Sequence, residues 1–160
     1  MKKILLIFFL GQNTLSYSQN KNFSIVDNLI VWKYVYEDSL SVKNLMNNPR
    51  LEFRNDSTGI IKKTNFENKK LNQLTGDFKI ESKKGKYRVN VFNLKFHVDP
   101  VGLSSSKISM QTISEYTIEK SILKKDGTIR EKSLGYNLTE TLNPHLIDLF
   151  KIKNKPNTDW

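Results

Sequence analysis

The sequence predicts one α+β domain, with a curled antiparallel sheet, a short helix after the first strand and a C-terminal helix packed on one face. Three observations carry this prediction. A run of β-branched and aromatic residues fills positions 29–36, apolar and polar residues alternate over 76–98, and an amphipathic segment starts at Asn143. Several antiparallel strands followed by a closing helix are typical of α+β domains.

The first strand is expected at residues 29–36, because β-branched and aromatic residues favour the extended conformation. Residues 19–28 are polar and are interpreted as a loose leader. Residues 37–39, Glu-Asp-Ser, offer a helix cap. The apolar residues of 40–46 would line one side of a short helix, which the Asn-Asn-Pro of 47–49 ends.

Two short strands are expected next. Residues 51–53 alternate in polarity, and 55–59 form a cluster of turn residues. Residues 59–64 return as the next strand. The polar residues 65–75 are interpreted as a connection.

The strongest local pattern lies in residues 76–98. Apolar residues occupy even positions before the turn at 83–86, where a glycine supplies a positive φ, and odd positions after it. From Phe92 onward the apolar residues are even again. Since side chains alternate faces with period two, this switch predicts either a bulge near Val91-Phe92 or a strand covered on both sides, and the bulge is favoured.

The last third of the chain is expected to begin with a loop at 99–106. Residues 112–124 fit a strand or a helix, but the following Asp126-Gly127 is a hairpin signal and favours a hairpin of 112–124 with 127–134. Asn143 is expected to cap the last helix, with Pro144 at its first position. This helix should pack across the sheet.

The N-terminus has the anatomy of a secretory signal peptide. A basic start at residues 1–3 precedes an apolar run at 4–10, and small residues suit cleavage between Ser18 and Gln19, or one residue later. A membrane anchor is a weaker interpretation, since spanning a bilayer takes about 20 apolar residues, and an ordinary buried segment is another. We therefore expect residues 1–18 to be removed and the protein to be periplasmic or secreted.

Charge and cysteine content limit the function classes. The chain carries 26 basic and 16 acidic residues, a formal net charge of +10, and losing Lys2 and Lys3 would leave +8. Such a domain attracts polyanions, which outside a cell are lipopolysaccharide, anionic lipid headgroups or acidic glycans. The absence of cysteine excludes disulfides, thiolate metal sites and a lipoprotein anchor. Arginine, which binds phosphate in a fork, is scarce, so nucleic acid is not an expected partner.

Two groups of cations are the candidate binding residues. One group lies on the first hairpin and the other on the second: Lys83, Lys84, Lys86 and Arg88, then Lys124, Lys125, Arg130 and Lys132. If the two hairpin tips lie together, they form an anion-binding patch with Tyr87 nearby. The alternative is that charged tips only keep sheet edges from pairing with other molecules.

No residue pattern predicts catalysis or metal binding. His97 precedes Asp99 and several serines, but a Ser-His-Asp site needs convergence in space, and no nucleophile-elbow glycines flank any serine. His145 is interpreted as a solvated surface group. Two isolated histidines without cysteine lack metal-ligand spacing. We therefore expect no catalytic, cofactor-binding or metal site, and no enzymatic activity.

The hairpin sequence carries a family resemblance. Residues 75–81 and 84–94 resemble the hairpin of an exported Bacteroidota family of unknown function with a fold like the TATA-box-binding protein (TBP-like). Its members show a Lys-Asp-Gly-Lys-Tyr turn followed by Arg or Lys, and residues 84–88 match its last five positions except that Lys84 takes the place of the aspartate. The resemblance covers residues 28–98. It implies a TBP-like fold and export, but neither a catalytic residue nor DNA binding, because fold does not fix function.

The sequence therefore favours an uncharacterised, non-catalytic binding domain of the cell envelope, acting on an anionic envelope surface or on another envelope protein. The second interpretation is an accessory subunit of an envelope assembly, for which an exposed apolar sheet face would be the interface. A hydrolase is the weakest alternative. It would need a pocket in which His97 meets a serine and an acid.

Overall fold

The computed structural model describes residues 22–64, 73–97, 115–133 and 136–153. The predicted signal peptide, its cleavage site and the predicted loop at 99–106 lie outside these residues. The elements are, in chain order, β1 (Phe23–Val26), β2 (Leu29–Tyr36), the 3₁₀ helix η1 (Val42–Asn47), β3 (Leu51–Phe53), β4 (Thr58–Thr64), β5 (Gln73–Lys83), β6 (Lys86–His97), β7 (Glu115–Thr117), α1 (Ile118–Ile122), β8 (Lys132–Ser133), β9 (Tyr136–Asn137), the π-helical turn η2 (Leu138–Leu142) and α2 (Asn143–Leu149).

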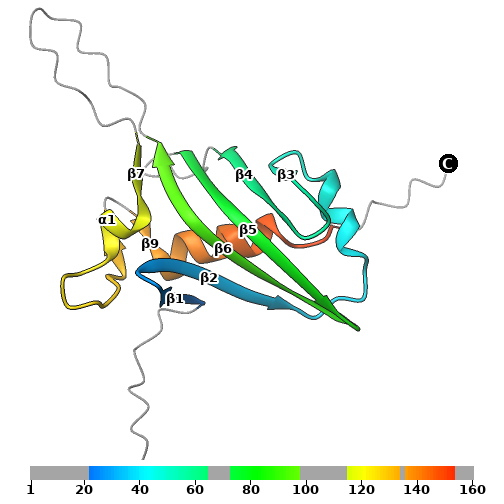
Figure 1. Cartoon of the computed structure of the whole chain (residues 1–160), viewed down its shortest axis with the longest axis horizontal. Helices are drawn as coiled ribbons and strands as arrows, with labels where there is room; N and C mark the ends of the chain where they lie inside the picture. The colour runs from blue at the N-terminus through cyan, green and yellow to red at the C-terminus, as the bar shows by residue number, and fades with distance from the viewer. Residues whose placement is uncertain (1–21, 65–72, 98–114, 134–135, 154–160) are drawn as a thin grey trace, which may run out of the picture.

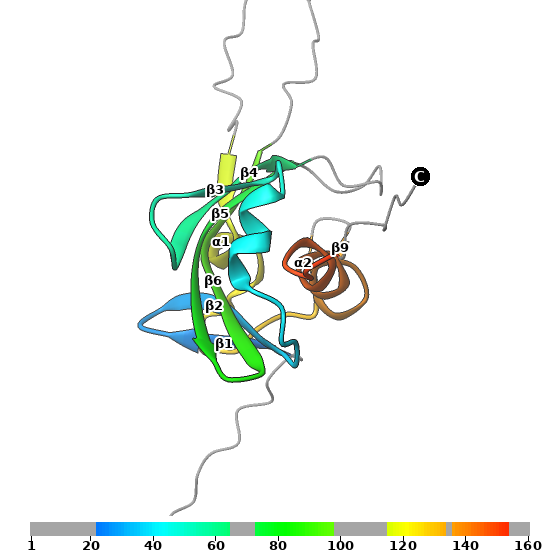
Figure 2. The same ribbon diagram turned by 90° about the vertical axis from the view of Figure 1, so that its right-hand side faces the viewer.

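One curled sheet forms the body of the molecule (Figure 1). Its strands pair antiparallel in the order β1-β2-β6-β5-β4-β3, and β7 adds to the far end of β6. Figure 2 shows α2 and η1 on the same side of the sheet, with the β1–β2 and β3–β4 turns projecting to the other side. The α+β class predicted from the sequence is confirmed. We call the side away from α2 the open face.

The core lies between the sheet and α2. Trp32, Phe78 and Val89 point inward and are almost fully buried. Phe150, just after α2, stacks on Trp32 with 6.3 Å between ring centroids and meets Phe78 edge-on at 5.2 Å. Burying such large aromatic side chains contributes much of the stability of a domain that lacks disulfides.

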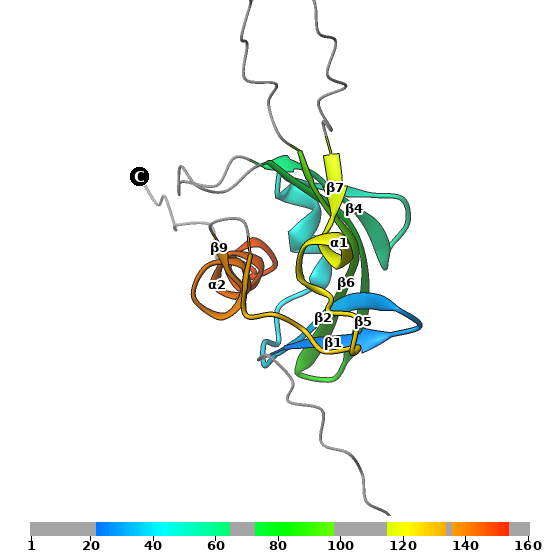
Figure 3. The same cartoon turned by 90° about the vertical axis from the view of Figure 1, so that its left-hand side faces the viewer.

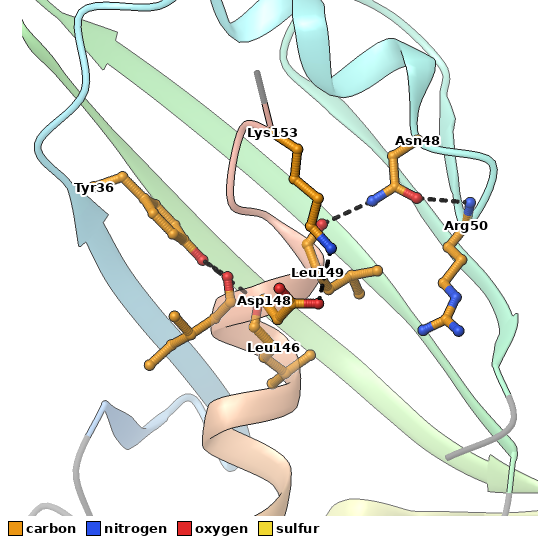
Figure 4. Close-up of polar contacts among 8 residues, drawn as sticks. Tyr36, Asn48, Arg50, Leu146, Asp148, Leu149 and Lys153 are labelled. Atoms are coloured by element: carbon orange, nitrogen blue, oxygen red, sulfur yellow. Dashed lines mark hydrogen bonds and ion pairs between the residues drawn. The ribbon is translucent and has the colours of Figure 1, made fainter. Parts of the chain in front are cut away.

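Polar side chains bind the C-terminal end of α2 to β2 and to the end of η1 (Figure 4). Tyr36 donates its hydroxyl proton to the Ile147 carbonyl at 2.9 Å, and the Asn48 side-chain amide donates to the Leu149 carbonyl at 2.8 Å. The last carbonyls of a helix have no partner within it, so these two bonds satisfy groups that would otherwise be orphaned.

The predicted hairpin at 76–98 is confirmed, including its turn and its bulge. Gly85 has φ of +74°. The pairing of β5 with β6 shifts between Thr75, opposite Lys95, and Asp77, opposite Phe92. Asn93, with φ of +52°, lies in the shifted stretch, one residue beyond the predicted position. The strand β5 begins at Gln73, inside the predicted connection.

Residues 19–28 are not a loose leader throughout, because β1 forms an antiparallel hairpin with β2. Phe23 is fully buried. The hairpin turn is made by Asp27 and Asn28, with φ of +49° and +63°. Positive φ at both central residues is the geometry of a type I′ turn, which Asn and Asp tolerate without glycine. Because this turn contains no glycine, the sequence pattern did not indicate it.

The short helix after β2 is a 3₁₀ helix that starts later than predicted. Its cap is Ser41, whose hydroxyl accepts from the Lys43 amide at 3.3 Å, and not Asp38 or Ser39. The Asp38 carboxylate instead accepts from the Leu40 amide in a local turn. Within η1 only Leu45 is buried, because a helix this short presents one residue to the core.

The predicted hairpin of 112–124 with 127–134 is wrong. Residues 118–122 form α1, whose Ile118 and Ile122 are both fully buried, one helical turn apart. The Asp126-Gly127 turn exists, but it is closed by a single bridge between Leu123 and Ile129, and β8 pairs with β9. Four-residue spacing fits a helix as well as a strand, so packing decides between them.

Asn143 is not the cap of the last helix. It lies inside a helical run that starts at η2, with φ of −62° and ψ of −50°. The cap is Asn137, whose side-chain oxygen accepts from the amides of Thr139 and Glu140. Asn143 is 4% exposed, and its side-chain oxygen accepts hydrogen bonds from Asn22 and Trp32 inside the protein. Among the described residues, no helix has the length and apolar character needed to span a membrane.

Candidate functional site

The two predicted cation groups lie at opposite ends of the sheet (Figure 1). Residues 83–88 surround the β5–β6 turn, whereas residues 124–132 connect α1 to β8 beside the start of β2. They therefore do not form one patch, and the combined patch expected from the sequence is corrected to two separate clusters. Tyr87 belongs to neither surface. It is 2% exposed, and its hydroxyl donates to the Phe150 carbonyl at 2.7 Å.

The β5–β6 end carries both signs of charge. A cavity of about 330 Å³ opens between this turn and residues 38–43, and a second of about 370 Å³ lies on the other side of the turn. Both are lined by Lys83 and Lys86. The first is also lined by the carboxylates Asp38 and Asp56, so this end presents a mixed surface.

Arg88 has an acidic partner on the open face, where both residues line the second cavity together with Lys83 and Lys86. Its Nε donates to a Glu81 carboxylate oxygen at 2.8 Å, a second guanidinium nitrogen contacts the same oxygen, and Lys79 lies 3.4 Å from the other one. The hydrogen bond from Arg88 lowers the pKa of Glu81. Arg88 is therefore already neutralised, unlike the lysines of the turn.

The same pairing extends along the open face. Arg54 lies 3.4 Å from Asp77, which also accepts from the Asn93 amide at 2.8 Å. Lys95 pairs with Glu115 at 3.0 Å and lowers the pKa of that carboxyl. Arg54, Lys79, Arg88 and Lys95 thus neutralise carboxylates on the open face, whereas the exposed Lys33 of β2 has no ion pair among the described residues.

The α1–β8 segment is different, because its carboxylates are bound to hydrogen-bond donors other than its own cations. Glu119 accepts from the Ile30 amide at 2.9 Å, and Glu131 accepts from the Thr139 amide at 2.9 Å. The hydroxyl and the amide of Thr128 bind Asp126 and lower its pKa. In the described part of the chain no ion pair engages the exposed cations of this segment, Lys120, Lys124, Lys125, Arg130 and Lys132.

His97 lies among polar side chains of neighbouring strands. The Thr75 hydroxyl oxygen is 2.9 Å from its Nε2, and a Glu115 oxygen is 3.8 Å from its Nδ1. A hydroxyl, an imidazole and a carboxylate in this order are also the parts of a hydrolytic triad, but a triad works with an oxyanion hole and a substrate pocket. Neither cavity described above is lined by His97. Asp99 and the serines near it lie outside the described residues.

His145 is not the solvated group that the sequence suggested. It is half-buried at the start of α2, and burial, reinforced by the nearby charge of Arg50, lowers its pKa to about 4. An imidazole in this setting stays neutral at physiological pH. Among the described residues, no group of three or more histidine and carboxylate side chains could hold a metal ion.

Comparisons with known proteins add little to this geometry. No protein-family model and no curated protein matches the chain. The chain is similar to a solved structure described as a TBP-like protein from Parabacteroides distasonis, with 10% identity and a TM-score of 0.44 over 79% of this chain and 94% of that one. A similarity of this size establishes neither a shared fold nor a shared function.

Proposed function

We propose that the protein is an exported, non-catalytic binding domain that attaches to an anionic surface of the cell envelope through the cations at the ends of its sheet. We further propose that its sheet and helices follow the TBP-like arrangement. Export rests on the signal-peptide pattern of residues 1–18, and the TBP-like arrangement rests on the hairpin resemblance in residues 75–94.

One observation carries the binding proposal. Four cations on the open face, Arg54, Lys79, Arg88 and Lys95, are paired with carboxylates and Lys33 of β2 is exposed there without an ion pair among the described residues, whereas the lysines at the two ends of the sheet have no ion pair in the described part of the chain. Unpaired cations at a projecting end keep their full attraction for an external anion. The net charge of +8 that remains without Lys2 and Lys3 adds a long-range field of the same sign.

The accessory-subunit interpretation has less support. An apolar sheet face would favour it, but the open face carries Arg54, Lys79 and Arg88 with their carboxylate partners. Of the large apolar side chains that are exposed among the described residues, Val35 lies on this face one residue before the end of β2, and the others lie at the β1–β2 turn or near η1. The contacts of His97 do not by themselves favour a hydrolase.

The test is retention on immobilised lipopolysaccharide at low salt. Three variants are compared with the parent: one with Lys83, Lys84 and Lys86 changed to Gln, one with Lys124, Lys125 and Arg130 changed to Gln, and one with all six changes. We expect salt-sensitive retention of the parent, partial loss in each triple variant and loss of most retention in the sixfold variant. Absence of retention, or retention unaffected by the sixfold change, would contradict the proposal. Circular dichroism checks that each variant is folded.

A further inference from the structure

The β1–β2 turn exposes an unusual group of apolar side chains. Ile25, Val26 and Leu29 are 36%, 46% and 39% exposed. Val26 and Leu29 are cross-strand partners next to the turn, and Ile25 is the partner of the buried Ile30. Turns are normally polar because they project into water. Three large apolar residues at a projecting turn are a feature that the fold itself does not require.

The basic α1–β8 segment lies beside this turn. The Ile30 amide donates to Glu119 at the start of α1, which fixes α1 against the first residues of β2. Figures 1 and 3 both show the connection from α1 to β8 at the same end of the molecule as the β1–β2 turn. An exposed apolar tip therefore has a group of unpaired cations next to it.

We infer that this end of the molecule inserts its β1–β2 turn into the headgroup region of an anionic lipid bilayer, while the cations of the α1–β8 segment contact lipid phosphates. Peripheral proteins bind membranes by this combination of buried apolar area and attraction to anionic lipid. The inference deepens the proposed function, because it names one end of the sheet and one kind of anionic surface.

The β5–β6 end is the competing candidate, and its chemistry fits a bilayer less well. Its cavity is lined by Asp38 and Asp56 beside Lys83 and Lys86, so lipid phosphates would meet carboxylates there. Each of the two cavities at this end is lined by a single exposed large apolar residue, Leu40 in the first and Val35 in the second, and the second also holds the paired Glu81 and Arg88. At the opposite end the carboxylates of the α1–β8 segment are already bound to amide and hydroxyl donors.

One carboxylate opposes the inference and gives it a sharp test. Asp27 is exposed at the apex of the β1–β2 turn, where it would approach lipid phosphates. Asn tolerates the same positive φ, so Asp27→Asn preserves the turn while it removes the repulsion. We expect Asp27→Asn to bind vesicles of phosphatidylglycerol and phosphatidylcholine several-fold more tightly than the parent.

Insertion is measured directly with a dye. Because the chain has no cysteine, Val26→Cys and Leu40→Cys each carry a single environment-sensitive label on the full chain. We expect the label at position 26, but not the one at position 40, to shift to the blue with phosphatidylglycerol vesicles. Neither label should shift with pure phosphatidylcholine.

Serine substitutions give a second test of insertion. Changing Ile25, Val26 and Leu29 to Ser should weaken vesicle binding about tenfold or more, and the matched change of Leu40 and Met46 to Ser should not weaken it.

The outcomes separate this inference from the proposed function. If vesicles bind but the label at position 26 stays in water, or if the label at position 40 shifts instead, the insertion is wrong and anion binding stands. Retention on lipopolysaccharide without vesicle binding has the same meaning. If neither surface binds the parent, both proposals fail.

Discussion

The indole nitrogen Nε1 of Trp32 donates a hydrogen bond of 2.9 Å to the side-chain oxygen of Asn143. The two residues are far apart in sequence and join β2 to the first turn of α2. The side-chain amide of Asn22 donates a hydrogen bond of 2.7 Å to the same oxygen. One buried acceptor therefore satisfies two donors and ties the N-terminal edge of the sheet to the C-terminal helix.

Asn143→Ala is expected to destabilise the fold by about 1 to 3 kcal/mol, because the buried indole N–H of Trp32 loses its acceptor. Urea unfolding followed by circular dichroism measures the change. Asn90→Ala, in the middle of β6, is the control, and it should cost less than about 0.5 kcal/mol. Equal costs for the two variants would mean that the shared acceptor contributes little.

Gly59 is the glycine that the sheet can least replace. A Cβ at this position would lie 2.2 Å from the Glu52 carbonyl oxygen and 2.5 Å from the Phe78 ring. Phe53 and Phe78 meet edge-on with 5.0 Å between centroids, and each is a cross-strand partner of Gly59. The absent side chain is what lets the Phe78 ring lie over β4.

Gly59→Ala is therefore expected to destabilise the fold by about 3 kcal/mol through overpacking. The matched control is Gly76→Ala, where the nearest atom is the end of the Leu94 side chain at 3.0 Å. That side chain can shift, so the control should cost about 1 kcal/mol. Thermal and urea denaturation of the two variants compare them, and a Gly59 variant as stable as the Gly76 variant would refute the steric argument.

The pKa of His145 makes stability fall in weak acid. Burial lowers this pKa from 6.5 to about 4. Between these values the unfolded chain binds a proton that the folded protein does not, so stability rises with pH across this window and is lost as pH falls through it. Discounting for the partial exposure of the ring, we expect a loss of about 1 kcal/mol between pH 7 and pH 5.

His145→Gln should remove most of that loss, since glutamine does not titrate. The measurement is urea unfolding of the parent and the variant at pH 7 and pH 5. His97→Gln controls for the loss of an imidazole elsewhere in the chain. A variant whose stability falls with acid as steeply as that of the parent would show that another group is responsible.

Local patterns predicted most of the sheet, because alternation along a strand reports which side chains are buried. The parity switch in β6 located a bulge to within one residue. Prediction failed where two conformations share one pattern. The spacing of Ile118 and Ile122 fits a strand as well as a helix, and only the packing of α1 against β6 decides for the helix. The Asp27-Asn28 turn lacks the glycine that marks most two-residue hairpins.

The candidate site was predictable only in part. Its cations were visible as clusters along the chain, but whether two clusters meet depends on topology. The strand β6 runs from the turn at Lys86 to the neighbourhood of β7 and α1, so it holds the clusters at opposite ends. The ion pair of Arg88 with Glu81 could not be predicted from the sequence either, because it depends on the register of β5 against β6.

That pairing leads to a final prediction about Arg88. Since its guanidinium is engaged by Glu81, Arg88→Gln should leave retention on lipopolysaccharide within about twofold of the parent. An exposed ion pair contributes little to stability, so the fold should tolerate the change. Glu81→Gln is the matched variant. It releases Arg88 toward the cations of the β5–β6 turn and should strengthen retention at low salt. If Arg88→Gln weakens retention as much as the change of Lys83, Lys84 and Lys86 does, then Arg88 contacts the anionic surface directly and its pair with Glu81 opens on binding.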